Sequence, residues 1–246
     1  TQKIESVIKK TFPKARFARL DTDSTQGSNV LLDTLKMFKN MEIDILIGTQ
    51  MIAKGLDFPN ATLVGVVNAD IGLNIPDFRS GEKTFQLLYQ ASGRAGRSQK
   101  PGEVIIQSSS PDNLAIQHAT RLEIKKYYKL MLKEREELSY PPYSWLSKIE
   151  MVGKSKSYLS SLAQRFKENI KGKYKGLEVL GPAPCYYEKI RNQYRFQFIL
   201  KSSKSFDPNS KKLHKFVETN FLNQRGFKIN YNKCKVNIHR DPLNLN

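Results

Sequence analysis

The sequence predicts an α/β protein in two parts: a parallel-sheet lobe over residues 1–110 and a smaller α+β domain over residues 143–246, joined by a helical connector over residues 111–142. Three observations predict this division. Continuous apolar runs alternate with helical patterns in the first part, as is typical of parallel strands buried on both faces. Pro141 and Pro142 end the connector. Beyond them, polar and apolar residues alternate, which indicates half-exposed strands.

The first part is expected to alternate helices with strands. Helically spaced apolar residues predict helices over residues 3–10 and 28–38, the second with Ser28 as its N-cap. A short strand is expected over residues 15–20. Three further strands are predicted by apolar runs, IDILIG at 43–48, LVGVVN at 63–68 and GEVIIQ at 102–107.

The second part has a different element order. Strands are expected over residues 146–152, 178–180, 194–200 and 235–239, with helices over residues 155–171 and 211–222. The second strand should be short, because the GPAP sequence at 181–184 would break it. The order β-α-β-β-α-β predicts a small split βαβ sandwich with its helices on one face.

Positive charge is concentrated in the second part. The chain carries a net charge of +18, and residues 1–110 hold 14 Lys and Arg against 11 Asp and Glu, whereas residues 111–246 hold 27 against 12. This asymmetry favours a polyanionic partner for the second part, most simply nucleic acid. The alternative is a Lys-rich surface that only confers solubility.

The cysteines and the apolar runs exclude several classes of protein. The two cysteines, Cys185 and Cys234, form no CxxC pair, so we expect no metal site. Free thiols fit a reducing, cytoplasmic setting. No apolar run reaches the length of a transmembrane helix, so we expect no membrane association. The chain begins at Thr1, and we expect it to be a fragment of a longer protein.

The sequence YQASGRAGR at residues 89–97 is the first candidate site. An expected helix over residues 82–91 precedes it, and Arg94 and Arg97 stand three residues apart between glycines. If the helical path continued, both guanidinium groups would share a face, and guanidinium is suited to phosphate oxygens. The alternative is that a glycine caps the helix and the arginines are solvated charges that complement the helix end.

The sequence GTQMIAKGLDFP at residues 48–59 is the second candidate site. Thr49 and Gln50 follow an expected strand directly, at the strand end where ligands bind in parallel sheets. Their hydroxyl and amide groups can reach a phosphate or a ribose. Gly55 permits a close backbone approach, and Asp57 offers a carboxylate. The alternative is an ordinary connection in which Asp57 caps a turn.

The third candidate is a basic stretch interleaved with aromatic residues. Lys189, Arg191, Arg195, Lys201 and Lys204 lie in a region that also contains Tyr186, Tyr187, Tyr194 and Phe196. Basic side chains neutralise phosphates, and exposed aromatic rings stack on unpaired bases. We therefore predict that these basic residues bind DNA, with Lys189, Arg191 and Arg195 as the main contacts. The alternative for each aromatic residue is a place in the core, which is preferred for Phe196 and Phe198.

Taken together, these motifs resemble those of a known family. GTQMxxKGxDFP followed by QxxGRAGR resembles motifs V and VI in the second RecA-like lobe of superfamily 2 helicases. The intervening NADIGLNIPDFRSGEKTFQLLYQ is similar to the primosomal replication-restart helicases, as are PPY at 141–143, LGPAP at 180–184, RFQFIL at 195–200 and HRDPL at 239–243. The resemblance covers nearly the whole chain.

The resemblance implies roles for the motif residues in ATP hydrolysis. Arg94 and Arg97 resemble the arginine fingers that reach the γ-phosphate, and Gln90 is similar to the polar residue near the γ-phosphate or the attacking water. Gly55 and Asp57 resemble the pair that contacts the nucleotide ribose. The chain has no GxxxxGK[ST] and no DExH-like box. It would supply half of a site for ATP with Mg²⁺ and would be inactive alone.

The resemblance also implies partners. Thr49 resembles a threonine that touches the DNA backbone, and we group Gln50 with it as DNA-binding. The basic domain would have the fold of ribosomal protein S10. Lys211 and Lys212 would bind the acidic tail of single-stranded DNA-binding protein. The family's zinc module lies upstream of this segment.

The implied function is the C-terminal half of an ATP-dependent 3′–5′ DNA helicase that restarts stalled replication forks. It would be a cytoplasmic monomer that acts on forked and single-stranded DNA with primosomal loading proteins. One alternative is another superfamily 2 DNA translocase. The other is a non-enzymatic nucleic-acid-binding protein with a degenerate helicase lobe.

Overall fold

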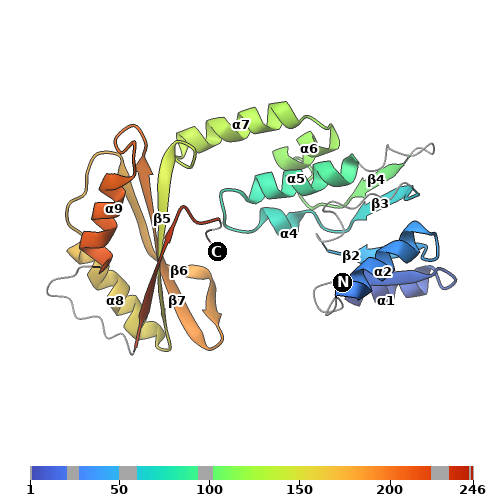
Figure 1. The fold of residues 1–246 in the computed structure, drawn as a ribbon, viewed down its shortest axis with the longest axis horizontal. Helices are drawn as coiled ribbons and strands as arrows, with labels where there is room; N and C mark the ends of the chain where they lie inside the picture. The colour runs from blue at the N-terminus through green and yellow to red at the C-terminus, as the bar shows by residue number, and fades with distance from the viewer. Residues whose placement is uncertain are drawn as a thin grey trace. The chain divides into compact units, whose positions relative to one another are not determined.

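The computed structural model describes residues 2–20, 28–49, 60–93, 102–222, 233–243 and 245. They form two compact units. The first comprises Thr1–Asn74 and Ser80–Tyr127, and the second comprises Ile75–Arg79 and Tyr128–Asn246 (Figure 1). The expected connector is therefore divided, since its first helix groups with the first unit and most of its second helix with the second unit.

The first unit alternates helices and strands as expected. Its elements in chain order are α1 (Gln2–Thr11), β1 (Phe17–Leu20), α2 (Ser28–Lys39), β2 (Ile45–Gly48), β3 (Leu63–Val66), α4 (Asp70–Leu73), α5 (Ser80–Ser92), β4 (Glu103–Ile106) and α6 (Leu114–Thr120). β1 pairs with β2 and β3 pairs with β4, and both pairs are parallel. The predicted parallel pairing is confirmed.

The β3–β4 pair is more exposed than its apolar sequence predicts. Leu63 and Ile105 are 58% and 53% exposed. The register places both on one face, because Leu63 lies opposite Glu103 and Gly65 opposite Ile105. The other face, with Val64 and the residues that share its side, is half-buried. The expectation of burial on both faces is wrong for this pair, since an apolar run does not specify how many faces are covered.

Helix α5 is held by one apolar face. Its buried residues recur at helical spacing and are Ser80, Thr84, Phe85, Leu88 and Ala91. The ring of Phe85 stacks on the buried ring of Tyr127, with the centroids 4.1 Å apart. The helix ends at Ser92, and the backbone N–H of the next residue, Gly93, donates to the carbonyl of Tyr89 over 2.9 Å. The GRAGR sequence therefore begins directly after the last helical residue.

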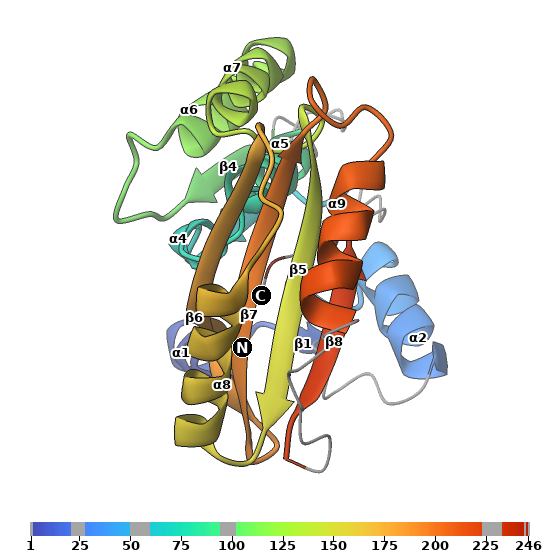
Figure 2. The ribbon, with the colours of Figure 1, turned by 90° about the vertical axis from the view of Figure 1, so that its left-hand side faces the viewer.

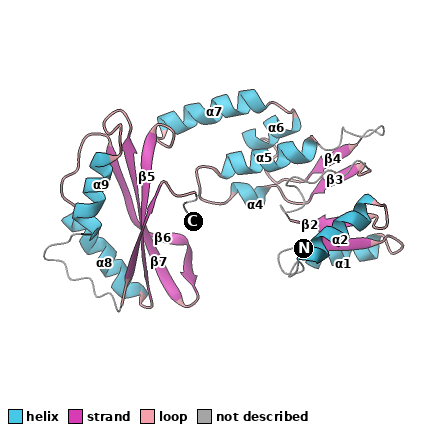
Figure 3. Ribbon diagram, in the orientation of Figure 1, coloured by secondary structure: helices cyan, strands magenta, loops and turns pink. Residues whose placement is uncertain are grey.

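The second unit contains the antiparallel sheet of the predicted split βαβ sandwich. Helix α7 (Ile124–Glu137) leads into β5 (Ser144–Gly153), α8 (Lys156–Asn169), β6 (Leu177–Ile190), β7 (Gln193–Ser203), α9 (Lys211–Val217), a π-helical turn (Glu218–Leu222) and β8 (Lys235–Arg240). The strand order is β6-β7-β5-β8, and every pair is antiparallel. Helices α8 and α9 cover one face (Figures 2 and 3). The predicted element order is confirmed.

The core of this unit lies between the sheet and its two helices. Its fully buried members include Ile149 and Phe198 from the sheet and Leu159 and Phe166 from α8. Phe196 and Phe198 both belong to this core, as expected. The opposite face of the sheet carries buried polar groups, among them Lys148 and Glu150.

Strand β6 is longer than predicted. It continues through Pro182 and Pro184 to Ile190, with a register shift against β7 between Leu180 and Ala183. The expected break is wrong because, among the strands that the structure describes, β6 pairs only with β7 and lies at an edge of the sheet. On an edge, a proline that lacks an N–H removes no hydrogen bond to a second neighbour.

The Ile75–Arg79 segment belongs to the second unit through contacts with the C-terminal residues. The Asp77 carboxylate accepts from the backbone N–H of Leu245 over 3.1 Å. Arg79 donates to the carbonyls of Pro242 and Leu243 over 3.1 Å and 3.3 Å. The Phe78 ring stacks on Tyr140 with the centroids 4.4 Å apart. We call the hydrogen bonds of Asp77 and Arg79 to the C-terminal residues the C-terminal clasp.

Candidate functional site

Most of the residues predicted in the two helicase-like motifs lie outside the described part of the chain. These are Gly55, Asp57, Arg94 and Arg97 of the nucleotide site and the predicted DNA-binding residue Gln50. Two candidates are described. Thr49 is exposed directly after β2, and Gln90 is half-buried in the last turn of α5. The roles of all seven residues stay predictions.

The carboxyl ends of β3 and β4 are fastened together by Asp70. Its carboxylate accepts from the Ser108 hydroxyl over 2.7 Å and from the Ser109 backbone N–H over 2.8 Å. The Ala69 backbone N–H donates to the carbonyl of Gln107 over 3.0 Å. The hydrogen bond from the Ser108 hydroxyl, followed by that from the Ser109 backbone, lowers the pKa of Asp70. Asp70 therefore joins two strand ends as a carboxylate.

The turn between β6 and β7 presents basic side chains to solvent. Lys189 and Arg191 are exposed. The turn residues Arg191 and Asn192 have φ angles of 47° and 63°, as a two-residue hairpin turn with two left-handed residues requires. The Lys189 Nζ lies 5.0 Å from the centroid of the Tyr194 ring. Lys189 and Arg191 therefore lie together at one end of the sheet.

Two other basic candidates lie elsewhere in this unit. Lys201 is buried and pairs with Glu178 over 2.9 Å, so its expected place on a DNA-binding surface is wrong. The Lys204 Nζ lies 4.1 Å from the centroid of the Trp145 ring.

Three lysines from other elements join the two basic residues of the β6–β7 turn at their end of the sheet. Lys235 lies opposite Val152 near the end of β5, and Lys154 follows β5 directly. Lys233 precedes β8, with its Nζ 5.9 Å from the Tyr158 ring centroid. We call the exposed residues Lys154, Lys189, Arg191, Lys233 and Lys235 the basic end of the sheet.

Within the described residues, no member of the basic end forms an ion pair. Sequence reasoning missed the three lysines because they are far apart in the chain. Only the strand order, which brings the end of β5 beside the starts of β7 and β8, could have indicated them.

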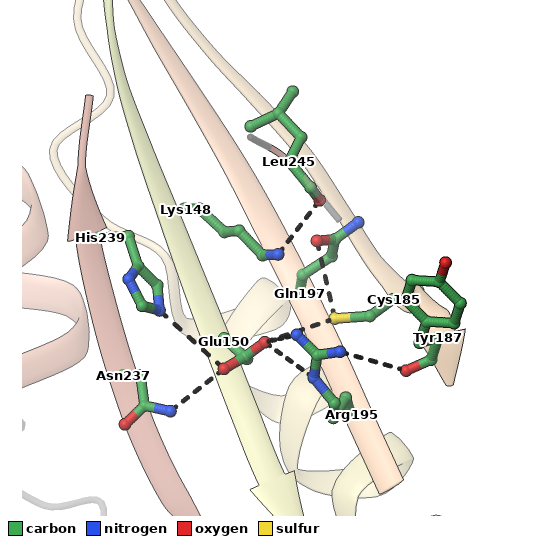
Figure 4. Close-up of polar contacts among 9 residues, drawn as sticks. All are labelled: Lys148, Glu150, Cys185, Tyr187, Arg195, Gln197, Asn237, His239 and Leu245. Carbon is green, nitrogen blue, oxygen red and sulfur yellow. Dashed lines mark hydrogen bonds and ion pairs between the residues drawn. The ribbon is translucent and has the colours of Figure 1, made fainter. Parts of the chain in front are cut away.

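Arg195 occupies a different environment, inside the sheet. Its Nε donates to Glu150 Oε1 over 3.0 Å, and its Nη1 donates to the Tyr187 carbonyl over 3.4 Å (Figure 4). Glu150 Oε2 also accepts from the Asn237 side chain over 3.1 Å. Burial by itself raises the pKa of Glu150, but the hydrogen bonds from Arg195 and Asn237 outweigh it and lower the pKa.

These bonds use the Arg195 guanidinium within the second unit, so whether it also contacts DNA stays a prediction. Sequence reasoning missed its partner Glu150, an acidic residue within the expected strand over residues 146–152. In the described part of the chain, no three His, Cys, Asp or Glu side chains cluster as metal ligands, and no helix is long and apolar enough to cross a membrane.

Comparison with known proteins assigns both units to characterised domains. Residues 1–99 match the helicase conserved C-terminal domain, and residues 136–243 match the primosomal protein N C-terminal domain. The chain is also similar to the replication restart protein PriA of several bacteria. Identity is 44% over 205 residues with that of Bacillus subtilis and 40% over 215 residues with that of Chlamydia pneumoniae.

These matches cover most of this chain and a minor part of each relative. The Bacillus subtilis match covers 82% of the chain and 25% of that protein, and the Chlamydia pneumoniae match covers 87% and 29%. A third relative, the replication restart protein PriA of Borreliella burgdorferi, is 38% identical over 88% of the chain and 33% of its own length. The chain thus spans about a quarter to a third of these relatives, and it belongs to the family of the replication restart protein PriA.

Proposed function

We propose that this chain is part of an ATP-dependent 3′–5′ DNA helicase that restarts stalled replication forks. The observation that carries the proposal is the pair of domain matches in one chain, a helicase C-terminal domain followed by the C-terminal domain of primosomal protein N. Relatives named replication restart protein PriA, 38% to 44% identical, support it. The chain would supply the second RecA-like lobe and a DNA-binding domain.

The nucleotide would be ATP with Mg²⁺, held jointly with the first lobe of the whole protein. Arg94 and Arg97 would face the γ-phosphate, Gln90 would lie near the attacking water, and Gly55 with Asp57 would contact the ribose. The end of α5 at Ser92 supports this arrangement, because Gln90 lies in the last turn, shortly before the GRAGR sequence. The chain alone would not hydrolyse ATP.

The DNA would contact the basic end of the second unit. Lys189 and Arg191 would bind phosphates, and the three lysines that share this end extend the predicted surface. Their exposure and the charge asymmetry of the chain support this role. Thr49 and Gln50 would touch the DNA backbone from the helicase lobe. Arg195 would bind DNA from within the sheet, where its guanidinium is also hydrogen-bonded to Glu150.

The further partners are proposed from the family. They are forked and single-stranded DNA, the acidic tail of single-stranded DNA-binding protein at Lys211 and Lys212, and the primosomal loading proteins. The whole protein would act as a monomer in the cytoplasm. Any zinc would belong to a module of the whole protein other than this segment.

The decisive experiment is alanine substitution of the arginine fingers in the whole protein. DNA-stimulated ATP hydrolysis should fall by about 10³- to 10⁵-fold in Arg97→Ala, since charge on the γ-phosphate oxygens would be unmatched in the transition state. Arg121→Ala is the matched control, because Arg121 is an exposed arginine at the C-cap of α6. If Arg97→Ala hydrolyses ATP as fast as the wild-type protein, Arg97 is not an arginine finger. DNA-stimulated hydrolysis by this chain alone would contradict the shared site.

A further inference from the structure

Strand β6 carries a large bulge opposite Arg195. The pairing of β6 with β7 reaches Pro184 opposite Phe196 and resumes at Lys189 opposite Tyr194. Residues 185–188, with the sequence CYYE, therefore stand opposite a single residue of β7. Bulges of this kind turn side chains away from the directions that a regular strand imposes.

The bulge is anchored along its length. The Cys185 side chain is buried, and its Sγ lies 3.6 Å from Gln197 Oε1. The Tyr187 carbonyl accepts from Arg195 (Figure 4). Glu188 pairs with Lys156 at the start of α8 over 2.6 Å. Three separate contacts thus hold the backbone of the bulge in place.

Between these anchors, the bulge presents two aromatic rings to solvent. Tyr186 and Tyr187 are 50% and 56% exposed. In a regular strand, neighbouring side chains point to opposite faces of the sheet. Here the two ring centroids are 4.9 Å apart in an edge-to-face arrangement. The bulge therefore brings two exposed rings together on a fixed backbone, which limits the entropy that they lose on binding a flat partner.

Charge next to the rings indicates what that partner is. Lys189 and Arg191 follow the two tyrosines along the chain, and both are exposed. Aromatic rings beside basic side chains suit single-stranded nucleic acid, because unpaired bases stack on the rings while the phosphates meet the cations. Bases inside a duplex are stacked on one another and cannot use such rings without being extruded.

We propose that Tyr186 and Tyr187 form a stacking platform for unpaired bases of single-stranded DNA, positioned by the Arg195–Glu150 pair beneath the bulge. The proposal rests on the proposed function and deepens it. It assigns the single-strand contacts of the basic end to the CYYE bulge and leaves phosphate binding to Lys189 and Arg191. Stacking is indifferent to base identity, so the platform is tolerant of sequence.

The test measures binding of a fluorescent oligothymidylate to the full 246-residue chain by anisotropy at low salt. The Tyr186→Ala/Tyr187→Ala variant should bind about ten- to hundredfold more weakly, whereas the conservative Tyr186→Phe/Tyr187→Phe variant should restore binding. Tyr128→Ala, an exposed tyrosine on α7, is the matched control. A second probe is an abasic oligonucleotide of equal length, which keeps the phosphates and lacks the bases. Wild type should bind it as weakly as the alanine pair binds oligothymidylate.

The outcomes separate this proposal from the proposed function. If the alanine pair binds oligothymidylate like wild type while Lys189→Ala/Arg191→Ala binds weakly, the platform is wrong and the basic DNA-binding end stands. Equal affinity of wild type for the abasic and normal oligonucleotides would also overturn the platform. If wild type binds neither probe, the nucleic-acid partner is wrong for the whole second unit, and the exposed rings serve a protein partner.

Discussion

Glu150 connects three strands of the second unit at the level of a single carboxylate. It lies on β5, accepts from Arg195 on β7 and accepts from Asn237 on β8 (Figure 4). Its side chain is only 9% exposed, and that of Arg195 is 15% exposed. A carboxylate that is removed from water needs such partners, because its desolvation costs several kcal/mol.

Loss of Arg195 should therefore destabilise the fold strongly. We predict that Arg195→Met lowers the free energy of unfolding by about 3 kcal/mol, because it leaves Glu150 without its cation in a buried site. Urea unfolding followed by Trp145 fluorescence measures this change. The control is Lys167→Met, which changes an exposed residue. Adding Glu150→Gln to the Arg195 variant should recover part of the loss. A variant as stable as wild type would show that the pair is dispensable.

Asp44 should make the stability of the first unit depend on pH. Its carboxylate accepts from the Arg16 side chain over 2.7 Å and from the Arg16 backbone over 2.8 Å. The side-chain hydrogen bond is the larger cause, and together these contacts lower the pKa from 3.8 to about 2. The unfolded carboxyl takes up its proton near 3.8 and the folded one near 2. The contribution of Asp44 to stability is therefore present above the higher value and is lost as the pH falls through the lower one.

An NMR titration of the Asp44 carboxyl carbon should give a midpoint near 2 in the wild-type chain. In Arg16→Met, the midpoint should move up toward 3.8, the ordinary value. Lys10→Met, which changes an exposed lysine of the same unit, is the control and should leave the Asp44 midpoint near 2. An Asp44 midpoint that does not respond to the Arg16 substitution would show that the hydrogen bonds are not maintained in solution.

At the level of elements, sequence patterns predicted the strands and helices better than their extent. Apolar spacing located every described helix of the split βαβ sandwich, because one buried face imposes a helical period. It failed at β6, where Pro182 suggested an end and the edge position permitted continuation. The bulge at residues 185–188 could not be predicted either, since it depends on which β7 residue lies opposite.

At Gly153, β5 closely approaches the backbone of the residues before β8. A Cβ atom at this position would lie 2.4 Å from the backbone oxygen of Lys233. We predict that Gly153→Ala lowers the free energy of unfolding by about 1–3 kcal/mol, because the backbone would have to shift. Gly65→Ala in β3 is the matched control, with no atom within 4 Å of the added group. Equal stability of the two variants, measured by urea unfolding, would contradict the close approach.

At the level of the whole molecule, the sequence predicted two parts with different charge, but it did not predict which segments of the chain belong to each part. The Ile75–Arg79 segment lies between α4 and α5 in the chain, yet it groups with the second unit. The contacts responsible join residues more than 160 positions apart, as between Arg79 and the Pro242 carbonyl. No local pattern encodes a hydrogen bond to a distant backbone carbonyl. The nucleotide-site residues stay predictions for another reason, since most of them lie outside the described segments.

Removing the C-terminal clasp should loosen the second unit. We predict that a chain ending at Asp241 unfolds at a lower urea concentration than the full chain. The truncation removes the carbonyls that accept from Arg79 and the Leu245 carbonyl that accepts from the buried Lys148 over 3.1 Å. Hydrogen bonds to charged groups contribute about 1.5–3 kcal/mol each. Trp145, the only tryptophan, belongs to this unit and donates to the Asp207 carbonyl over 2.9 Å, so its fluorescence reports the transition.

The control for this truncation is Leu243→Ala, because the Leu243 side chain is 86% exposed and its contribution to the clasp is a backbone carbonyl. That variant should unfold like the full chain, whereas Leu245→Ala, which removes a side chain that is 8% exposed, should unfold between the two. If the truncated chain unfolds at the same urea concentration as the full chain, the clasp adds no stability. Residues 75–79 would then be held to the second unit by the aromatic contact of Phe78 with Tyr140 instead.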